Sequence, residues 1–268
     1  MSAMDNSARF VADIPRNYDR FLGPFFFAPY AHDLAKRVAA ERPRRVLEIA
    51  CGTGILTDHL RRALTDAVAL TATDLNAPMI EYARSKLGDT GVTWREADGT
   101  RLPFANHTFD AVVCQFGYMF FPDKVAGFRE AARVLTPNGT LWFSVWSSLD
   151  ENPAGWIPHQ AVSAVFETDP PQFYRVPFGY HDEAVIRAHL TAAGFRAVQI
   201  ERVKLQGEAP SAAALAAGLL RGTPMYNMLV ERGANIDDLE LEVARRLADL
   251  GGASPVRLPL DARVIMAR

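Results

Sequence analysis

Short apolar runs that alternate with longer stretches of helical periodicity constrain the fold of this chain more than any other feature. The runs are Val46–Ile49, Val68–Thr73, Val92–Glu96, Phe109–Gln115 and Thr140–Val145. The helix-like stretches between them are Ile55–Leu64, Pro78–Leu87 and Lys124–Leu135. Such alternation is typical of parallel β-α-β units. The sequence therefore predicts an α/β fold, with a mostly parallel sheet and helices on both of its faces.

The first apolar run passes into a helix through a glycine-rich turn, Ala50–Gly54. Gly52 and Gly54 lack a Cβ, so they can adopt left-handed conformations and let a ligand approach main-chain N–H groups at the helix N-terminus. We therefore expect a cofactor on this turn. A dinucleotide is disfavoured, because Thr57 replaces the third glycine of the dinucleotide motif. Glu48 lies four residues before Gly52, where a carboxylate repels a pyrophosphate but suits a ligand with an ammonium group.

Further segments follow this turn in a fixed order. They are Thr71–Met79, Ala97–Phe104, Phe109–Cys114 and Arg133–Leu141. Together with Leu47–Gly54, they resemble the ordered motifs of class I S-adenosylmethionine-dependent methyltransferases over residues 44–146. The subgroup that they resemble best is that of small-molecule methyltransferases of ubiquinone and menaquinone biosynthesis. The resemblance implies a seven-stranded Rossmann-like core and S-adenosylmethionine as the cofactor, and we expect no metal.

The resemblance also implies which residues contact the cofactor. Asp74 ends the second strand and is expected to bind the ribose hydroxyls, whereas Asp98 is expected to meet the adenine amino group. Either carboxylate has a local alternative, because Asp can cap a helix or close a turn without a ligand. Gln115 and Phe116 match the position that flanks the adenosine. The full predicted cofactor site is Tyr18, Glu48, Ala50, Gly52, Gly54, Asp74, Leu75, Met79, Ala97, Asp98, Gly99, Gln115 and Phe116.

The catalytic residue stays unassigned, because methyl transfer from a sulfonium depends mainly on holding the nucleophile and the methyl group in line. The candidate general bases are Tyr18, His32, Tyr118, His159 and His181. Each of them has an ordinary structural role as its alternative. Related enzymes often carry histidines after the fourth strand, whereas Gln115–Asp123 contains none. Catalysis by proximity in an apolar pocket is therefore the prediction.

Aromatic side chains outside the motifs suggest the kind of acceptor. The aromatic segment Tyr18–Phe27 is expected to pack under an N-terminal helix, to form a wall of the pocket, or both. Later aromatic and apolar candidates for the pocket are Trp156, Phe173, Tyr174, Phe178, Met225 and Tyr226. A small acceptor that is largely apolar or aromatic suits such a wall.

The rest of the chain is expected to surround the core. Residues 1–43 form a helical cover with a helix at 25–41, and residues 44–206 form the core, with a substrate-side excursion at about 147–180. Residues 207–255 are predicted to be a helical lid inserted before the last strand, at 256–268. Further predicted helices are 152–166, Asp182–Ala193, Ser211–Leu220 and Ile236–Leu250. The resemblance implies that the strands Phe195–Val203 and Val256–Met266 pair antiparallel at the sheet edge.

Composition limits the partners. The 268 residues are 49% hydrophobic and carry a net charge of −2, which leaves no excess of Lys and Arg for binding a nucleic acid. Two cysteines give no disulfide framework, and no run of 18 apolar residues predicts a membrane span. With no apolar leader at the N-terminus, we expect a cytoplasmic protein. The sequence leaves a homodimer open.

The predicted function is S-adenosylmethionine-dependent methyl transfer to a small-molecule acceptor, which makes the protein an enzyme. The alternative from another class is a protein that binds S-adenosylmethionine or S-adenosylhomocysteine without turnover, which the missing base leaves open. A nicotinamide oxidoreductase is disfavoured by the same residues, Glu48 and Thr57, that disfavour a dinucleotide.

Overall fold

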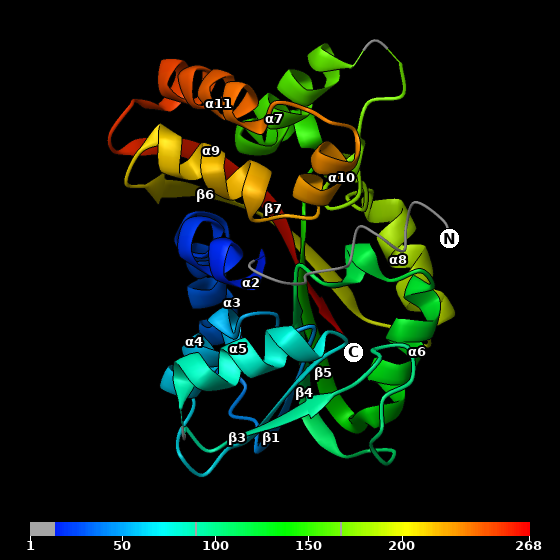
Figure 1. The fold of residues 1–268 in the computed structure, drawn as a ribbon. Helices are drawn as coiled ribbons and strands as arrows, with labels where there is room; N and C mark the ends of the chain where they lie inside the picture. The colour runs from blue at the N-terminus through cyan, green and yellow to red at the C-terminus, as the bar shows by residue number, and fades with distance from the viewer. Residues whose placement is uncertain (1–13, 89, 167) are drawn as a thin grey trace.

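A seven-stranded sheet forms the centre of the molecule in the computed structural model, which describes residues 14–88, 90–166 and 168–268 (Figure 1). The strands are β1 (Arg45–Ile49), β2 (Ala69–Asp74), β3 (Val92–Glu96), β4 (Phe109–Gln115), β5 (Leu135–Trp146), β6 (Val198–Ala209) and β7 (Val256–Ala267). Their order is β3-β2-β1-β4-β5-β7-β6. The first five strands pair in parallel, and β7 runs antiparallel to both β5 and β6. The predicted mostly parallel seven-stranded sheet and its antiparallel edge pair are confirmed.

Helices cover both faces of the sheet because alternate side chains of the central strands point to opposite sides. Val46 of β1 packs in a cluster with α3 (Ala28–Ala40) and α4 (Ile55–Ala63). Leu47, the next residue, belongs to the larger cluster on the other face, which includes α6 (Lys124–Val134) and α8 (Glu183–Ala192). The helix α5 (Ala77–Leu87) packs along β2 and β3.

A layer of helices lies beside β6 and β7, at the upper end of the sheet in Figure 1. It consists of α7 (Pro153–Val165), α9 (Ala212–Arg221), α10 (Met225–Glu231) and α11 (Ile236–Gly251). Short 3₁₀ turns connect other segments, namely η2 (Tyr118–Phe120), η3 (Leu149–Glu151) and η4 (Phe173–Arg175). None of the helices in the described part of the chain is long and apolar enough to cross a membrane.

Several helices begin where the sequence predicts, because a polar side chain just before each one accepts a hydrogen bond from its first turn. These N-caps are Asp123 for α6, Asp182 for α8, Ser211 for α9 and Asn235 for α11. The short helix α10 was not predicted. It has no side-chain cap of this kind and spans only two turns.

Two strands are longer than predicted by more than one residue. β5 begins at Leu135, five residues before the expected Thr140, because Leu135 pairs with Phe109 across an irregularity in the ladder. β6 begins later than expected and continues through Gly207 to Ala209, since its partner β7 offers a continuous row of pairing residues. The predicted boundary between core and lid at residue 207 therefore falls inside a strand.

The helical structure before α3 begins at Ile14, well before the predicted start at residue 25. After α2 (Ile14–Asn17), the chain forms a ten-residue π-helix, η1 (Tyr18–Phe27). Pro24 lies inside it and has no N–H to donate, and the N–H of Ala28 reaches back five residues to the carbonyl of Gly23. The predicted helix at 25–41 thus corresponds to the end of η1 and α3. Residues 1–13 of the predicted cover lie outside the described residues.

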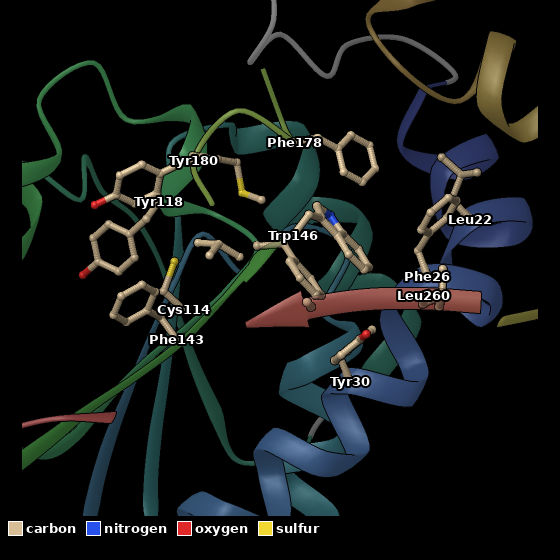
Figure 2. Packing of buried hydrophobic residues seen from close by; sticks show 14 of the residues in the cluster. Leu22, Phe26, Tyr30, Cys114, Tyr118, Phe143, Trp146, Phe178, Tyr180 and Leu260 are labelled. Atoms are coloured by element: carbon tan, nitrogen blue, oxygen red, sulfur yellow. The ribbon is translucent and has the colours of Figure 1, made fainter. Parts of the chain in front are cut away.

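Aromatic residues fill the space between η1, the sheet and the helical layer (Figure 2). The rings of Phe116 and Trp146 are stacked, with centroids 3.8 Å apart and an interplanar angle of 3°. Tyr30 meets both of them edge-on. Of the residues expected to line an acceptor pocket, Phe173, Tyr174, Phe178 and Met225 are instead part of this core. They are buried by packing, since α7 lies on β7 and on α9, and η4 lies on α7.

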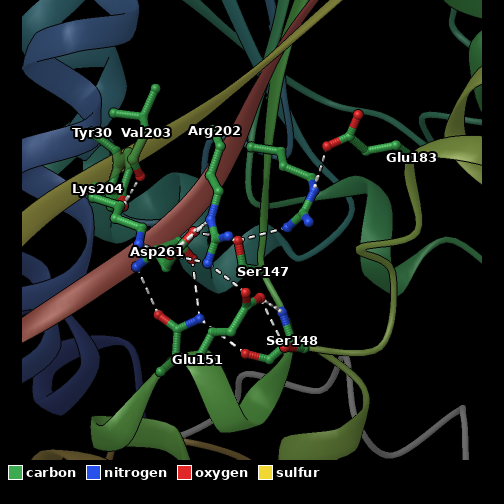
Figure 3. A network of polar contacts seen from close by, with 11 residues as sticks. Tyr30, Ser147, Ser148, Glu151, Glu183, Arg202, Val203, Lys204 and Asp261 are labelled. Carbon is green, nitrogen blue, oxygen red and sulfur yellow. Dashed lines mark hydrogen bonds and ion pairs between the residues drawn. The ribbon is translucent and has the colours of Figure 1, made fainter.

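A polar network ties the start of the helical layer to the sheet (Figure 3). The buried carboxylate of Asp261 on β7 accepts hydrogen bonds from the Ser147 hydroxyl at 2.6 Å and from the Arg202 guanidinium at 2.7 to 3.0 Å. The side-chain N–H of Asn152 donates a hydrogen bond to the carbonyl of Asp261, and its Oδ1 accepts one from the N–H of Asp261. Burial opposes ionisation of Asp261, but these donors hold its pKa below the ordinary value. The network therefore fixes where the chain leaves β5.

Candidate functional site

A cavity lies beyond the carboxyl ends of β1, β2 and β4, the usual place for ligands in a parallel α/β sheet. It encloses about 1050 Å³, open solvent at its mouth included. The cavity is lined by every residue of the predicted cofactor site except Gly54, namely Tyr18, Glu48, Ala50, Gly52, Asp74, Leu75, Met79, Ala97, Asp98, Gly99, Gln115 and Phe116. The structure thus brings together residues predicted from five separate segments.

The glycine turn between β1 and α4 is left-handed at three positions. Ala50, Gly52 and Gly54 have φ values of 56°, 54° and 77°. A Cβ on Gly52 would meet nothing within 4 Å, so this residue leaves the cavity side open. A Cβ on Gly54 would lie 3.0 Å from the Cβ of Ala83 on α5. Gly54 therefore shapes the turn from behind, which is why it does not line the cavity.

Asp74 holds the turn in place. Its side chain is 6% exposed and accepts hydrogen bonds from the N–H of Gly52 at 2.9 Å and from the N–H of Asn76 at 2.8 Å. Burial raises its pKa, while these hydrogen bonds lower it. Asp74 thus has the role in a turn that was the alternative to ligand binding. It also lines the cavity.

Glu48 has a partner that was not identified from the sequence. The residue is 1% exposed, and its carboxyl group accepts a hydrogen bond of 2.7 Å from the hydroxyl of Thr57 on α4. Burial, with a smaller contribution from the charge of Asp74, raises its pKa to about 8 despite the hydrogen bond from Thr57. At neutral pH, Glu48 is therefore mostly protonated in the ligand-free protein.

Asp98 closes a turn at the mouth of the cavity. Its Oδ1 accepts hydrogen bonds from the N–H of Thr100 at 2.8 Å and from the Thr100 hydroxyl at 2.7 Å. The side chain is exposed. Asp98 therefore both closes a turn and lines the cavity.

Residues of η1 form the roof of the cavity. The rings of Tyr18 and Phe27 are stacked, with centroids 4.8 Å apart. The side-chain N–H of Gln115 donates to the carbonyl of Phe27 at 2.8 Å, which ties this roof to β4. Asp19 forms an ion pair of 2.6 Å with Lys86 on α5. Burial, with the nearby charges of Asp74 and Asp19, keeps the pKa of Tyr18 well above its ordinary value.

Of the candidate bases, Tyr18 alone lines the cavity. His32 packs against His59, with ring centroids 6.0 Å apart, and Tyr118 is fully buried among aromatic rings. His159 is buried on α7, and Nδ1 of His181 lies 2.9 Å from the carbonyl of Phe178. The residues that line the cavity include no histidine and no lysine.

The cavity has further wall residues that were not assigned to the cofactor site from the sequence. They are Phe27, Ile49, Cys51, Thr53, Ile55, Leu56, Asn76, Thr100, Gly117, Phe120, Phe121 and Pro122. Most of them adjoin a predicted residue, so the motifs themselves could have indicated them. Phe120–Pro122 could not be found this way, because η2 folds this segment back over the cavity. Cys51 is buried beside Glu48, and burial together with the charge of Glu48 raises the pKa of its thiol, which fits packing and not nucleophilic chemistry.

Most of the residues that line this cavity lie in a segment that matches a known family. Residues 46–139 match the methyltransferase domain family. Over these residues the chain carries a methyltransferase domain. The chain is 38% identical over 109 residues to the demethylmenaquinone methyltransferase of Deinococcus radiodurans, a match that covers 40% of this chain and 45% of the relative. The chain is also 31% identical over 186 residues to the methyltransferase tpcH of Aspergillus fumigatus, and this match covers 62% of each chain.

The fold of the methyltransferase domain is also found among solved structures. The phosphoethanolamine N-methyltransferase 2 of Haemonchus contortus, solved with phosphomonomethylethanolamine and S-adenosylhomocysteine, aligns with a TM-score of 0.63 at 15% identity. The alignment covers 100% of this chain and 60% of that protein. At this identity the likeness concerns the fold alone, and the chain spans less than two thirds of the length of the two sequence relatives above.

Proposed function

We propose that the domain binds S-adenosylmethionine in this cavity and transfers its methyl group to a small acceptor that is largely apolar or aromatic. The observation that carries the proposal is the placement of Glu48, Asp74 and Asp98 along one cavity that begins at the glycine turn. The names of the Deinococcus and Aspergillus relatives support the reaction, and the S-adenosylhomocysteine complex of the Haemonchus enzyme supports the cofactor.

The residues present fit this cofactor at each of its polar groups. Glu48 lies where it can face the ammonium group, Asp74 can accept from the ribose hydroxyls, and Asp98 can accept from the adenine amino group. Leu75 and Met79 offer apolar contact to the adenosine from beside Asp74. When bound, the cofactor supplies an electrophilic methyl group on a sulfonium.

The chain contributes position and exclusion of water. The roof of Tyr18 and Phe27 covers the cavity, and Gln115 fixes the height of that roof above β4. Aromatic and aliphatic walls hold an apolar acceptor with few competing waters. Tyr18 keeps its proton at neutral pH because its pKa is raised, so it can donate a hydrogen bond but does not serve as a base. We therefore propose catalysis by proximity and orientation.

Calorimetry with S-adenosylhomocysteine tests the binding. The wild-type protein is expected to bind it, and Asp74→Ala is expected to lose at least about 100-fold in affinity, because it removes charged hydrogen bonds and loosens the turn at Gly52. Asp66→Ala is the matched control, since Asp66 is exposed in the turn before β2. A folded wild-type protein that does not bind the ligand would contradict the proposal.

Mass spectrometry with S-adenosylmethionine and a panel of quinols, phenols and amines tests the transfer. A mass increase of one methyl group is the expected result. Binding without any transfer across the panel would favour the non-catalytic alternative. The division into a core at 44–206 and a lid at 207–255, a homodimer, the lack of a nucleic-acid partner and a cytoplasmic location stay predictions from the sequence.

A further inference from the structure

Phe116 has a backbone conformation that is unusual for a bulky residue. It follows β4 on the cavity wall, and its φ is 52°, in the left-handed region. This conformation is unfavourable for a residue with a Cβ and persists only where the surrounding structure enforces it. The N–H of Phe116 donates to the carbonyl of Ser144 on β5 at 3.0 Å, and a Cβ on Gly117 would lie 2.6 Å from the Sγ of Cys114. The sheet and this close approach therefore fix where the ring of Phe116 lies.

The ring of Phe116 is stacked on one face only. Trp146 covers that face, with centroids 3.8 Å apart and nearly parallel planes. The centroid of Tyr30 lies 5.4 Å from both rings of this stack, and that of Phe27 lies about as far from one ring as from the other, at 5.9 and 6.1 Å. A ring over the second face would lie much farther from Trp146 than from Phe116, so Tyr30 and Phe27 both flank the rim of the stack. Within the described part of the chain, no aromatic ring stacks on the second face.

The cavity meets the stack at Phe116. Phe116 lines the cavity, whereas Trp146 and Tyr30 do not. Because Trp146 takes one face of the ring and its neighbours take part of the rim, the second face is the broad surface that the ring has left for the cavity. A flat aromatic ligand on this face would extend the stack by one ring, and such ring pairs gain more than burial of the same area alone. The geometry of the wall thus favours an aromatic ligand over an aliphatic one.

The order of the strands separates Phe116 from the carboxylates that are proposed to bind the cofactor. Glu48, Asp74 and Asp98 lie at or just after the ends of β1, β2 and β3. Phe116 follows β4, which lies on the other side of β1 from β2, and its stacking partner Trp146 ends β5. A cofactor held by the three carboxylates therefore leaves the second face of Phe116 to another ligand.

We propose that Phe116 is a specificity residue for the acceptor, and that the acceptor is a planar aromatic molecule whose ring stacks on the second face of Phe116. The inference deepens the proposed function and rests on it, because it assumes that the cavity takes S-adenosylmethionine. It narrows the acceptor from apolar or aromatic molecules to flat aromatic ones, such as phenols. The constrained backbone of Phe116 holds the acceptor ring in one plane, which suits in-line transfer.

Calorimetry with matched ligands, on protein saturated with S-adenosylhomocysteine, tests the stacking. The probes are 1-naphthol, which is flat, and decahydro-1-naphthol, which has the same carbon skeleton and hydroxyl but no aromatic ring. The wild-type protein is expected to bind 1-naphthol about three- to tenfold more tightly than decahydro-1-naphthol. In Phe116→Leu and in Phe116→Met this preference should fall below about twofold, whereas Phe116→Tyr, which keeps the ring, should retain it.

Phe121→Leu is the matched control. Phe121 also lines the cavity, but its ring lies against Gly99, where an added Cβ would come within 2.5 Å of it. This position is next to Asp98, the carboxylate that is proposed to meet the adenine. The preference for 1-naphthol should therefore be the same in Phe121→Leu as in the wild type. Loss of the preference in both variants would show that any aromatic wall provides it, and would overturn the role of Phe116.

The affinity for S-adenosylhomocysteine itself separates this inference from the proposed function. Phe116→Leu is expected to bind it within about twofold of the wild type, because the ring serves the acceptor. A larger loss would place Phe116 beside the adenosine, the role that the motifs imply, or in the support of the fold, and would overturn the inference. If the wild-type protein binds S-adenosylhomocysteine but does not prefer 1-naphthol, the inference is wrong and the cofactor site stands. If the wild-type protein does not bind S-adenosylhomocysteine, the proposed function itself fails.

Discussion

The affinity of the cavity for S-adenosylhomocysteine should depend steeply on pH because of Glu48. Burial raises the pKa of this carboxyl group to about 8 in the free protein, while its ordinary value is 4.5. A ligand with an ammonium group binds best to the ionised carboxylate. Binding therefore requires Glu48 to release its proton, and the affinity should rise with pH up to about 8.

The size of the effect follows from the pKa. With a value of about 8, Glu48 is roughly 1% ionised at pH 6 and roughly 9% ionised at pH 7. The affinity should thus increase about tenfold between pH 6 and pH 7, about fivefold more by pH 8, and less than about twofold beyond it. The stability of the free protein should change with pH in the opposite direction. The protonated carboxyl group of Glu48 makes its full contribution to stability below pH 4.5, and this contribution is lost as the pH rises through about 8.

Calorimetric titrations from pH 6 to pH 8.5 at constant ionic strength measure this dependence. In Glu48→Gln the slope should vanish, because the amide does not titrate but can still accept the Thr57 hydroxyl. In Thr57→Val the rise should move to higher pH, since the hydrogen bond from Thr57 lowers the pKa of Glu48. A wild-type affinity that stays within about twofold from pH 6 to pH 8, or an equal slope in Glu48→Gln, would refute the reasoning.

Two further predictions concern stability. Gly54→Ala should destabilise the protein by about 1–3 kcal/mol in urea unfolding, because it combines a φ of 77° with a Cβ only 3.0 Å from that of Ala83. Gly52→Ala should cost less stability, because the space around its Cβ is open. A larger loss of stability for Gly52→Ala than for Gly54→Ala would contradict this account. Tyr30→Phe should cost about 1–2 kcal/mol, because the buried hydroxyl of Tyr30 donates to the carbonyl of Val203 at 2.9 Å. A melting temperature equal to the wild type would show that this carbonyl finds another partner.

The regular core was predictable because its signals are local. β3 and β4 have the predicted bounds, and the N-caps mark the starts of α6 and α8. The π-helix η1 was not predictable, because its wide turns depend on contacts with distant parts of the chain. Gly218 of α9, for example, lies so close that an added Cβ would come within 2.6 Å of the Cβ of Phe21. The added residues of β5 likewise depend on pairing with Phe109.

The candidate site divides in the same way. The carboxylates and the glycine turn follow from motifs, because short β-α connections place them at one sheet edge. The contact of Glu48 with Thr57 could have been predicted from the sequence, because the two residues flank the same turn. The bond from Gln115 to Phe27 was not, because it joins residues 88 positions apart and no local pattern encodes it.

The roof of the cavity has a consequence for how the protein is made. η1 is translated before the strands β1 to β5, yet it packs on β6 and α9, which follow those strands. Contacts between such distant segments form late, because closing a long loop costs entropy. On the ribosome, the sheet from β1 to β5 can therefore assemble around the glycine turn while the roof of the cavity, η1, still lacks its contacts with β6 and α9. The nascent protein should therefore retain a ligand only after β6 and α9 have emerged.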